Sequence, residues 1–255
     1  MPNIQFNPKI SYLKNSSILF LTKKQITAIK TLKLDVCLKD QLVSLVTLQR
    51  FSAEQGEIIP LFIKQSLVLI VGLGDDQKIS KTSLRVAVKQ AIESPHLKGL
   101  ASLHVFPHAN DDETIFGMIE GILVGSYTWQ KYIEPVKGKK SLATVVIAAS
   151  FKSIYAQRIT ICGGVNYTRD LVNDNADVVH SLLMEDELKR LVKGQTNIRL
   201  EILKEKDLKK KGLNLLLAVN RASQYPPRLM IAHYQGGKKG SEDLAIIGKG
   251  ITFDT

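Results

Sequence analysis

The strongest constraint on the fold is an uninterrupted apolar run, Leu67–Val71, which the turn Gly72-Leu73-Gly74 follows directly. A strand with one face in water alternates apolar and polar residues, whereas a run that is apolar at every position is typical of a strand buried on both faces. Strands of that kind occur in sheets that carry helices on both sides. The run therefore predicts an α/β fold built around a central sheet.

The segments around this run alternate between strand and helix patterns, as an α/β fold requires. The helix after the turn is predicted to begin at a capping residue, either Ser80 or Thr82. The other predicted strands are Ser17–Leu21, Ile58–Ile63 (a weak or edge strand because of Pro60), Ser102–Phe106, Thr144–Ala149, Ile198–Leu203, Arg228–Tyr234 and Leu244–Ile247. Two further helices are predicted at Phe151–Leu171 and Ser181–Lys193.

The clearest helix pattern covers Asp112–Tyr132, and its acidic start suits the positive end of the helix dipole. Gly117, Gly121 and Gly125 recur at every fourth residue and therefore share one face of that helix. Each glycine costs a helix about 1 kcal/mol relative to alanine. Three glycines on one face predict that another backbone packs closely against it.

The formal net charge is +11, and the excess is spread along the chain, with +6 over residues 1–150 and +5 over residues 151–255. This balance fits solvated basic surfaces, and it leaves an anionic partner such as nucleic acid open. Cys37 and Cys162 make no disulfide framework and indicate reduced thiols. No apolar stretch is long enough for a signal peptide or a membrane span, so we expect a cytoplasmic protein without a membrane partner.

Several common catalytic and nucleotide-binding motifs are missing. Gln77 stands where a G-x-G-x-x-G loop beginning at Gly72 would need its third glycine, which favours an ordinary turn. The five histidines show no H-E-x-x-H spacing, and the chain contains no G-x-S-x-G sequence. A histidine zinc site and a serine hydrolase therefore have no local support.

The candidate chemistry lies in the segment Gly248–Thr255. The predicted strand before it would bring Lys249 to the carboxyl edge of a sheet, where α/β proteins place ligand sites. Gly250 permits a bend, so we expect Lys249 and Asp254 to converge there. Asp254 offers hard oxygen ligands, whereas Lys249 binds a metal only as a neutral amine. The residue types also fit a plainer interpretation, namely a core strand, a turn and a surface carboxylate.

Four segments in order resemble the leucine (cytosol) aminopeptidase family: Gly117–Tyr132, Arg169–Asn173, Leu215–Tyr234 and Gly248–Asp254. The last segment is similar to the start of the metal-binding signature of that family. The sequence departs from the family pattern after Asn173, where Asp174-Asn175-Ala176-Asp177 replaces a proline-containing segment. Ala222 also replaces a common glycine. These departures affect the expected local geometry and not the resemblance to the family.

The resemblance implies an α/β fold with three parts. Residues 1–150 would form a macro-like N-terminal domain, residues 151–172 a connecting helix, and residues 173–255 the incomplete start of a catalytic metallopeptidase domain. In this family two divalent ions, manganese or zinc, activate a water that attacks the N-terminal peptide bond of a peptide substrate. The resemblance assigns Lys249 as a ligand of one ion and Asp254 as a carboxylate that bridges both. Members of the family assemble as homohexamers.

The same resemblance places the remaining metal ligands and the catalytic residues outside this sequence. We therefore expect the 255-residue chain to be inactive by itself, to hold metal weakly or not at all, and not to form the hexamer. Two alternatives stay open, namely a basic module that binds nucleic acid and an inert truncated product.

Overall fold

The structure is a computed structural model that describes residues 1–134, 142–238, 240 and 242–251. Its contacts divide the chain into two units, Met1–Arg169 and Asp170–Thr255. The division falls inside the segment that the sequence predicts as a connecting helix.

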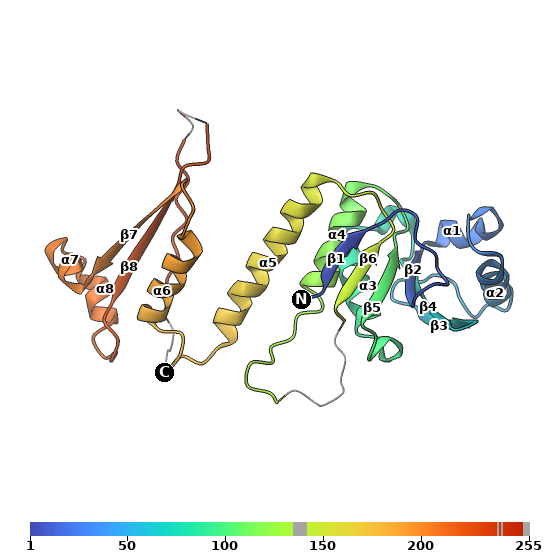
Figure 1. The fold of residues 1–255 in the computed structure, drawn as a ribbon, viewed down its shortest axis with the longest axis horizontal. Helices are drawn as coiled ribbons and strands as arrows, with labels where there is room; N and C mark the ends of the chain where they lie inside the picture. The colour runs from blue at the N-terminus through green and yellow to red at the C-terminus, as the bar shows by residue number, and fades with distance from the viewer. Residues whose placement is uncertain (135–141, 239, 241, 252–255) are drawn as a thin grey trace. The chain divides into compact units, whose positions relative to one another are not determined.

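The first unit is built on one six-stranded sheet (Figure 1). Its strands are β1 (Asn3–Phe6), β2 (Ser17–Leu21), β3 (Ile58–Ile63), β4 (Ser66–Gly72), β5 (Ser102–Phe106) and β6 (Thr144–Ile147). They lie in the order β1-β6-β5-β2-β4-β3, and every neighbouring pair is parallel except β3 with β4. Pro60 lies in the antiparallel edge strand β3, as predicted, because an edge strand tolerates the missing N–H donor.

The central strands are buried on both faces, which confirms the prediction from the apolar run. In β4, Leu69 and Val71 belong to one apolar core, whereas Val68 and Ile70 belong to the core on the opposite face. Residues of β2 alternate between the same two cores. Successive side chains of a strand point to opposite faces, so a strand with helices on both sides needs an apolar residue at every position.

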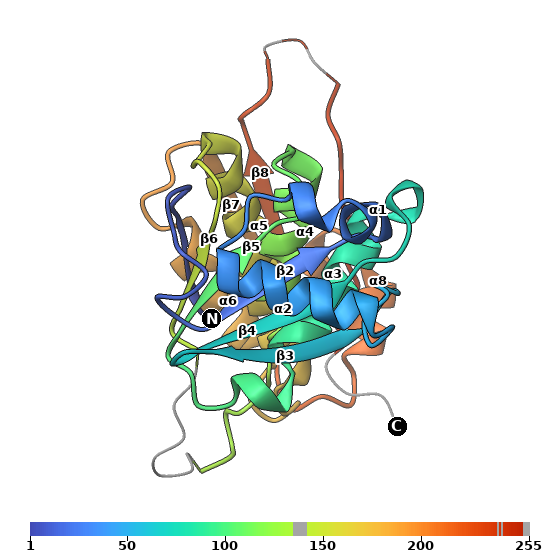
Figure 2. The ribbon, with the colours of Figure 1, turned by 90° about the vertical axis from the view of Figure 1, so that its right-hand side faces the viewer.

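Helices cover both faces of this sheet. They are α1 (Lys23–Thr27), α2 (Val36–Thr47), α3 (Lys81–Ile92), α4 (Asp112–Leu123) and α5 (Ser153–Asn173), with short 3-10 turns at Ile29–Thr31, Asp76–Lys78 and Pro95–Leu97. Figure 2 looks onto the face that α1 and α2 cover, while α3, α4 and α5 pack on the other face. Of the two predicted capping residues, Ser80 caps α3, because its hydroxyl accepts a hydrogen bond from the Ser83 backbone N–H.

The glycine face of α4 packs directly on α3. A Cβ atom built on Gly117 would lie 2.9 Å from the Leu84 Cβ, and one built on Gly121 would lie 2.6 Å from the Val88 Cβ. Both distances are shorter than real carbon contacts. The predicted close approach is therefore confirmed for these two glycines, whose missing side chains let the two helices pack against each other.

α4 ends at Leu123, so the predicted helix over Asp112–Tyr132 was too long. Side chains of α5 donate hydrogen bonds to the carbonyls at this end of α4. The Asn166 Nδ2 donates to the Leu123 carbonyl at 2.7 Å, and the Arg169 Nη1 donates to the Val124 carbonyl at 2.9 Å. The last carbonyls of a helix need partners outside it. These partners lie more than forty residues along the chain, where a local pattern does not reach them.

The second unit contains a two-stranded antiparallel sheet. Its elements after the end of α5 are α6 (Ser181–Val192), β7 (Ile198–Lys204), α7 (Glu205–Lys210), α8 (Asn214–Val219) and β8 (Arg228–Tyr234). β7 and β8 pair over their whole length, from Ile198 opposite Tyr234 to Lys204 opposite Arg228. Both strands and α6 form as predicted. Among the described residues, none of the helices combines the length and apolar content that a membrane crossing requires.

Replacing glycine by alanine should change the free energy of unfolding in opposite directions at two helical glycines, one at the contact between α4 and α3 and one away from it. Gly121→Ala should lower the free energy of unfolding by about 1–3 kcal/mol, because the new methyl group overlaps Val88. Gly163→Ala in α5 should raise it by up to about 1 kcal/mol, because the nearest atom to its new methyl group is the Met1 Cε at 3.9 Å. Urea unfolding followed by circular dichroism measures both. Equal midpoints for Gly121→Ala and the wild type would show that the glycine face is open.

Candidate functional site

The structure describes one of the two predicted metal ligands. Lys249 is exposed and lies in a segment without regular structure. Asp254 lies outside the described residues. The convergence of Lys249 and Asp254 therefore stays a prediction.

The strand predicted for Leu244–Ile247 is absent from the structure, and this prediction was wrong. Leu244, Ile246 and Ile247 expose 87%, 90% and 93% of their surfaces, and no residue of the segment belongs to a strand. A buried strand needs neighbouring strands and a covering layer. In the described part of the second unit, β7 and β8 pair only with each other, so this apolar segment has no sheet to join.

The described residues do not form a metal centre. Among them, no three His, Cys, Asp or Glu side chains gather into a group able to hold an ion. Lys249 would supply one nitrogen, whereas oxygen-ligated divalent ions take about six ligands each. Lys249 alone therefore cannot hold a pair of ions, and Asp254 lies outside the described residues.

A buried ion pair fixes β8, the strand that leads toward the Lys249 segment. The Glu185 side chain in α6 contacts the Arg228 Nε at the start of β8, and its other oxygen lies 2.6 Å from the Lys189 Nζ. Glu185 and Arg228 expose only 7% and 9% of their side chains. Hydrogen bonds from Lys189 and Arg228 lower the pKa of Glu185 to about 2. The sequence analysis did not single out this pair, although a charged residue opening an apolar strand was a usable signal.

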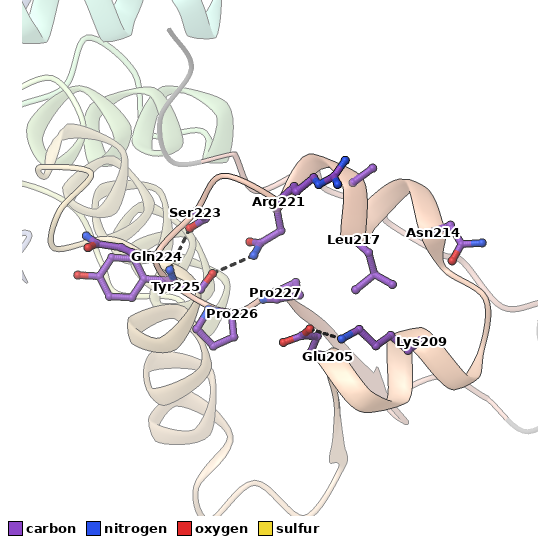
Figure 3. A pocket seen from close by; sticks show the side chains of 12 residues that line it. Glu205, Lys209, Asn214, Leu217, Arg221, Ser223, Gln224, Tyr225, Pro226 and Pro227 are labelled. Atoms are coloured by element: carbon purple, nitrogen blue, oxygen red, sulfur yellow. Dashed lines mark hydrogen bonds and ion pairs between the residues drawn. The ribbon is translucent and has the colours of Figure 1, made fainter.

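A hollow of about 690 Å³ lies in the second unit between α7, α8 and the loop that enters β8 (Figure 3). The Asn220 Nδ2 donates to the Tyr225 carbonyl at 2.9 Å, and the Tyr225 N–H donates to the Ser223 Oγ at 3.1 Å, which fixes the loop. Figure 3 shows Leu217 of α8 projecting toward the ion pair between Glu205 and Lys209 of α7. The Lys209 Nζ lies 2.6 Å from the Glu205 Oε1.

The walls of this hollow are suited to binding rather than to nucleophilic catalysis. Its lining includes Leu217, Pro226 and Pro227 as apolar surface, together with amide and charged side chains. The Ser223 hydroxyl accepts a hydrogen bond from a backbone N–H, and no histidine or cysteine is among the described residues that line the hollow. A serine needs an adjacent base to act as a nucleophile. Sequence patterns did not indicate the hollow because folding brings together residues that are up to 22 positions apart.

Comparison with protein-family models decides the classification. Residues 18–135 match the N-terminal domain of the cytosol aminopeptidase family, and residues 166–255 match the catalytic domain of the same family.

The chain belongs to the cytosol aminopeptidase family.

Curated relatives agree with this membership. A "Probable cytosol aminopeptidase" of Pseudomonas syringae pv. tomato is 32% identical over 207 residues, which are 76% of this chain and 41% of the relative. A protein with the same description from Protochlamydia amoebophila is 31% identical over 235 residues, which are 86% of this chain and 46% of the relative. The chain thus spans less than half the length of these cytosol aminopeptidases.

Solved structures support the fold. The match to a tomato leucine aminopeptidase mutant covers 100% of this chain and 55% of the mutant's chain, with a TM-score of 0.78 and 22% identity. The match to the bottromycin maturation enzyme BotP covers 84% of this chain and 45% of the BotP chain, with a TM-score of 0.67 and 20% identity. A further structure of BotP in complex with Mn matches with a TM-score of 0.64. The α/β fold that the family resemblance implied is therefore confirmed.

The Glu185 ion pair predicts an acid-dependent loss of stability. The pKa of Glu185 in the folded chain, about 2, lies below its ordinary value of 4.5, so the stabilisation is complete above pH 4.5 and is lost as the pH falls toward 2. At pH 7, Glu185→Gln should lower the free energy of unfolding by about 1.5–3 kcal/mol, the value of hydrogen bonds to charged groups. Urea unfolding at several pH values should show this difference shrinking as the pH falls from 5 to 2.

Asp186→Asn is the matched control for this experiment. Asp186 is the next residue of α6 and exposes 78% of its side chain, with Lys189 at 3.7 Å. An exposed ion pair of this kind contributes little to the free energy of unfolding. The control should therefore unfold like the wild type at every pH. A Glu185→Gln difference that stays constant between pH 7 and pH 2 would contradict the assignment of the low pKa to Glu185.

Proposed function

We propose that this chain is part of a two-metal aminopeptidase that releases N-terminal residues, leucine among them, from peptides. The observation that supports it is the match to both domains of one family in chain order, residues 18–135 and then 166–255. The segment with Lys249 and Asp254 lies inside the catalytic-domain match.

The proposed metal ligands are Lys249 and Asp254, with manganese or zinc as the ions. The chemistry of the donors supports this proposal, because a carboxylate is a hard oxygen ligand able to bridge two ions. In a complete site of this kind, bound metals would supply an activated water and would polarise the scissile carbonyl.

The described residues support inactivity of the 255-residue chain. They contain no cluster of acidic or histidine ligands, and the hollow beside α8 lacks a nucleophile with a base. Peptide hydrolysis by a metal-activated water requires ligands for the metal and groups that orient the substrate. The proposal therefore places the activity in a longer polypeptide that includes this chain.

The test compares the short chain with a chimera that continues through the remaining catalytic domain of the Pseudomonas syringae relative. With excess Mn²⁺, the short chain should not release leucine from a leucyl amide above background, and the chimera should do so. Asp254→Ala in the chimera should reduce turnover by more than about a hundredfold, because changes outside the ligand shell already cost up to that much.

Asp243→Ala is the matched control, since it removes an exposed carboxylate from the same segment and should leave turnover unchanged. Binding of Mn²⁺, followed by electron paramagnetic resonance, gives a second readout. Lys249→Ala and Asp254→Ala should weaken binding by the chimera, and Asp243→Ala should not. Metal-dependent turnover by the short chain that disappears with Asp254→Ala would show that other residues of this chain build the site.

A further inference from the structure

The helix α6 begins at a histidine whose ring acts as the capping side chain. The His180 Nδ1 accepts a hydrogen bond from the Leu183 backbone N–H at 3.3 Å. Serine, threonine, asparagine and aspartate make this bond in most helices, and all four keep their acceptor oxygen between about pH 5 and pH 8. The cap of α6 differs from these, because its acceptor is a nitrogen of the one side chain that ordinarily titrates in that range.

Protonation of the imidazole removes this cap. A ring nitrogen accepts a hydrogen bond only while it carries no proton, and both nitrogens of an imidazolium carry one. In the present geometry, the protonated Nδ1 of His180 would direct its N–H at the Leu183 N–H, so that two donors would face each other. The positive charge would also lie beside the positive end of the helix dipole, where a cation is unfavourable. Formation of the first turn of α6 and protonation of His180 therefore oppose each other.

The start of α6 also holds the loop that borders the hollow. The His180 ring stacks on the Tyr225 ring, with their centroids 3.7 Å apart and an angle of 12° between the ring planes. The next residue, Ser181, donates a hydrogen bond from its Oγ to the Pro226 carbonyl at 2.6 Å. Tyr225 and Pro226 both line the hollow (Figure 3). Two consecutive residues at the start of α6 therefore anchor two consecutive residues of its wall.

The segments around His180 carry other ionisable groups, which keep their charge where a histidine titrates. On residues 174–179, the first two turns of α6 and the loop 223–228, these groups are Asp174, Asp177, Glu185, Asp186, Glu187, Tyr225 and Arg228. Glu185 binds Arg228 and Lys189, and Glu187 binds Arg190. Carboxylates, a phenol and a guanidinium do not ordinarily change their charge between about pH 8 and pH 5. A change of this region within that range therefore reports on the imidazole.

We propose that His180 is a pH-sensitive latch of the second unit, closed while its imidazole is neutral and open once it is protonated. In the closed state the ring caps α6 and stacks on Tyr225. In the open state the first turn of α6 lacks its cap, the loop at Tyr225 and Pro226 loses its anchor, and the hollow changes shape. An ordinary histidine titrates near about pH 6.5, so the cap is complete above that pH and is lost as the pH falls toward 5. The latch does not depend on the proposed aminopeptidase activity.

Amide hydrogen exchange of the 255-residue chain, followed by NMR between pH 8 and pH 5, tests the latch against two variants. His180→Asn supplies a capping oxygen that does not titrate, whereas His180→Ala supplies no cap. The Leu183 amide of the wild type should be as protected as in His180→Asn at pH 8 and as weakly protected as in His180→Ala at pH 5. The two levels should differ by about fivefold, the factor expected for a typical cap. Circular dichroism at pH 8 verifies that both variants fold.

The same spectra test the coupling to the hollow and contain the control. The Tyr225 amide, which donates to the Ser223 Oγ, should lose protection with the same midpoint as the ring-carbon signals of His180. His233→Asn, which removes a histidine of β8 from the same unit, should leave both changes as they are in the wild type.

Three results would overturn the latch. The first is a His180 ring that stays neutral down to pH 5. The second is a wild-type Leu183 amide that matches His180→Asn at every pH although the ring titrates. The third is a Tyr225 amide whose protection is the same at pH 8 and pH 5, which would separate the cap from the hollow.

Discussion

The first unit depends on the burial of α4, because a helix inside the fold must have partners for all of its polar groups. Ten of its twelve residues are buried. At its start, the Asp111 side chain accepts the Thr114 N–H at 2.8 Å, which caps the helix. At its end, α5 side chains bind the carbonyls of Leu123 and Val124. Neighbouring elements thus satisfy both ends of α4, and loss of either set would leave buried polar groups unpaired.

Charge pairs reinforce the same arrangement. The carboxylate of Glu120, in the last turn of α4, lies 3.3 Å from the Arg85 Nη1 of α3 and 3.0 Å from the Arg158 Nη1 of α5. Glu120 exposes 11% of its side chain, so a missing partner would leave an almost buried charge unpaired. Together with the glycine contact, these pairs hold α3, α4 and α5 together as the layer on one face of the sheet.

The segments that indicate the family also contribute to packing in this chain. Arg169, the first residue of the R-D-L-V-N segment, binds the end of α4 and packs its guanidinium over the Tyr127 ring at 3.9 Å. Arg228, which follows Pro226 and Pro227, binds Glu185 and so connects α6 to β8. Two of the family-like segments therefore have a direct structural explanation here. The metal-binding role of Lys249 and Asp254 remains part of the proposed function.

The sequence by itself determined the elements whose signal is local. The apolar run of β4, the capping residues Ser80 and Thr82, and the spacing of Gly117 and Gly121 indicate a strand, a helix start and a close contact, each within a few residues. The alternation of strand and helix patterns extended this to the α/β fold, and the family resemblance indicated the family to which the chain belongs.

Only the tertiary structure decided where α4 ends, which acid binds Arg228, and whether Leu244–Ile247 joins a sheet. The first two depend on partners about 43 residues away in the chain, Asn166 for Leu123 and Glu185 for Arg228. The third depends on neighbouring strands, because a single apolar segment forms a buried strand only where a sheet offers it paired hydrogen bonds and a covering layer.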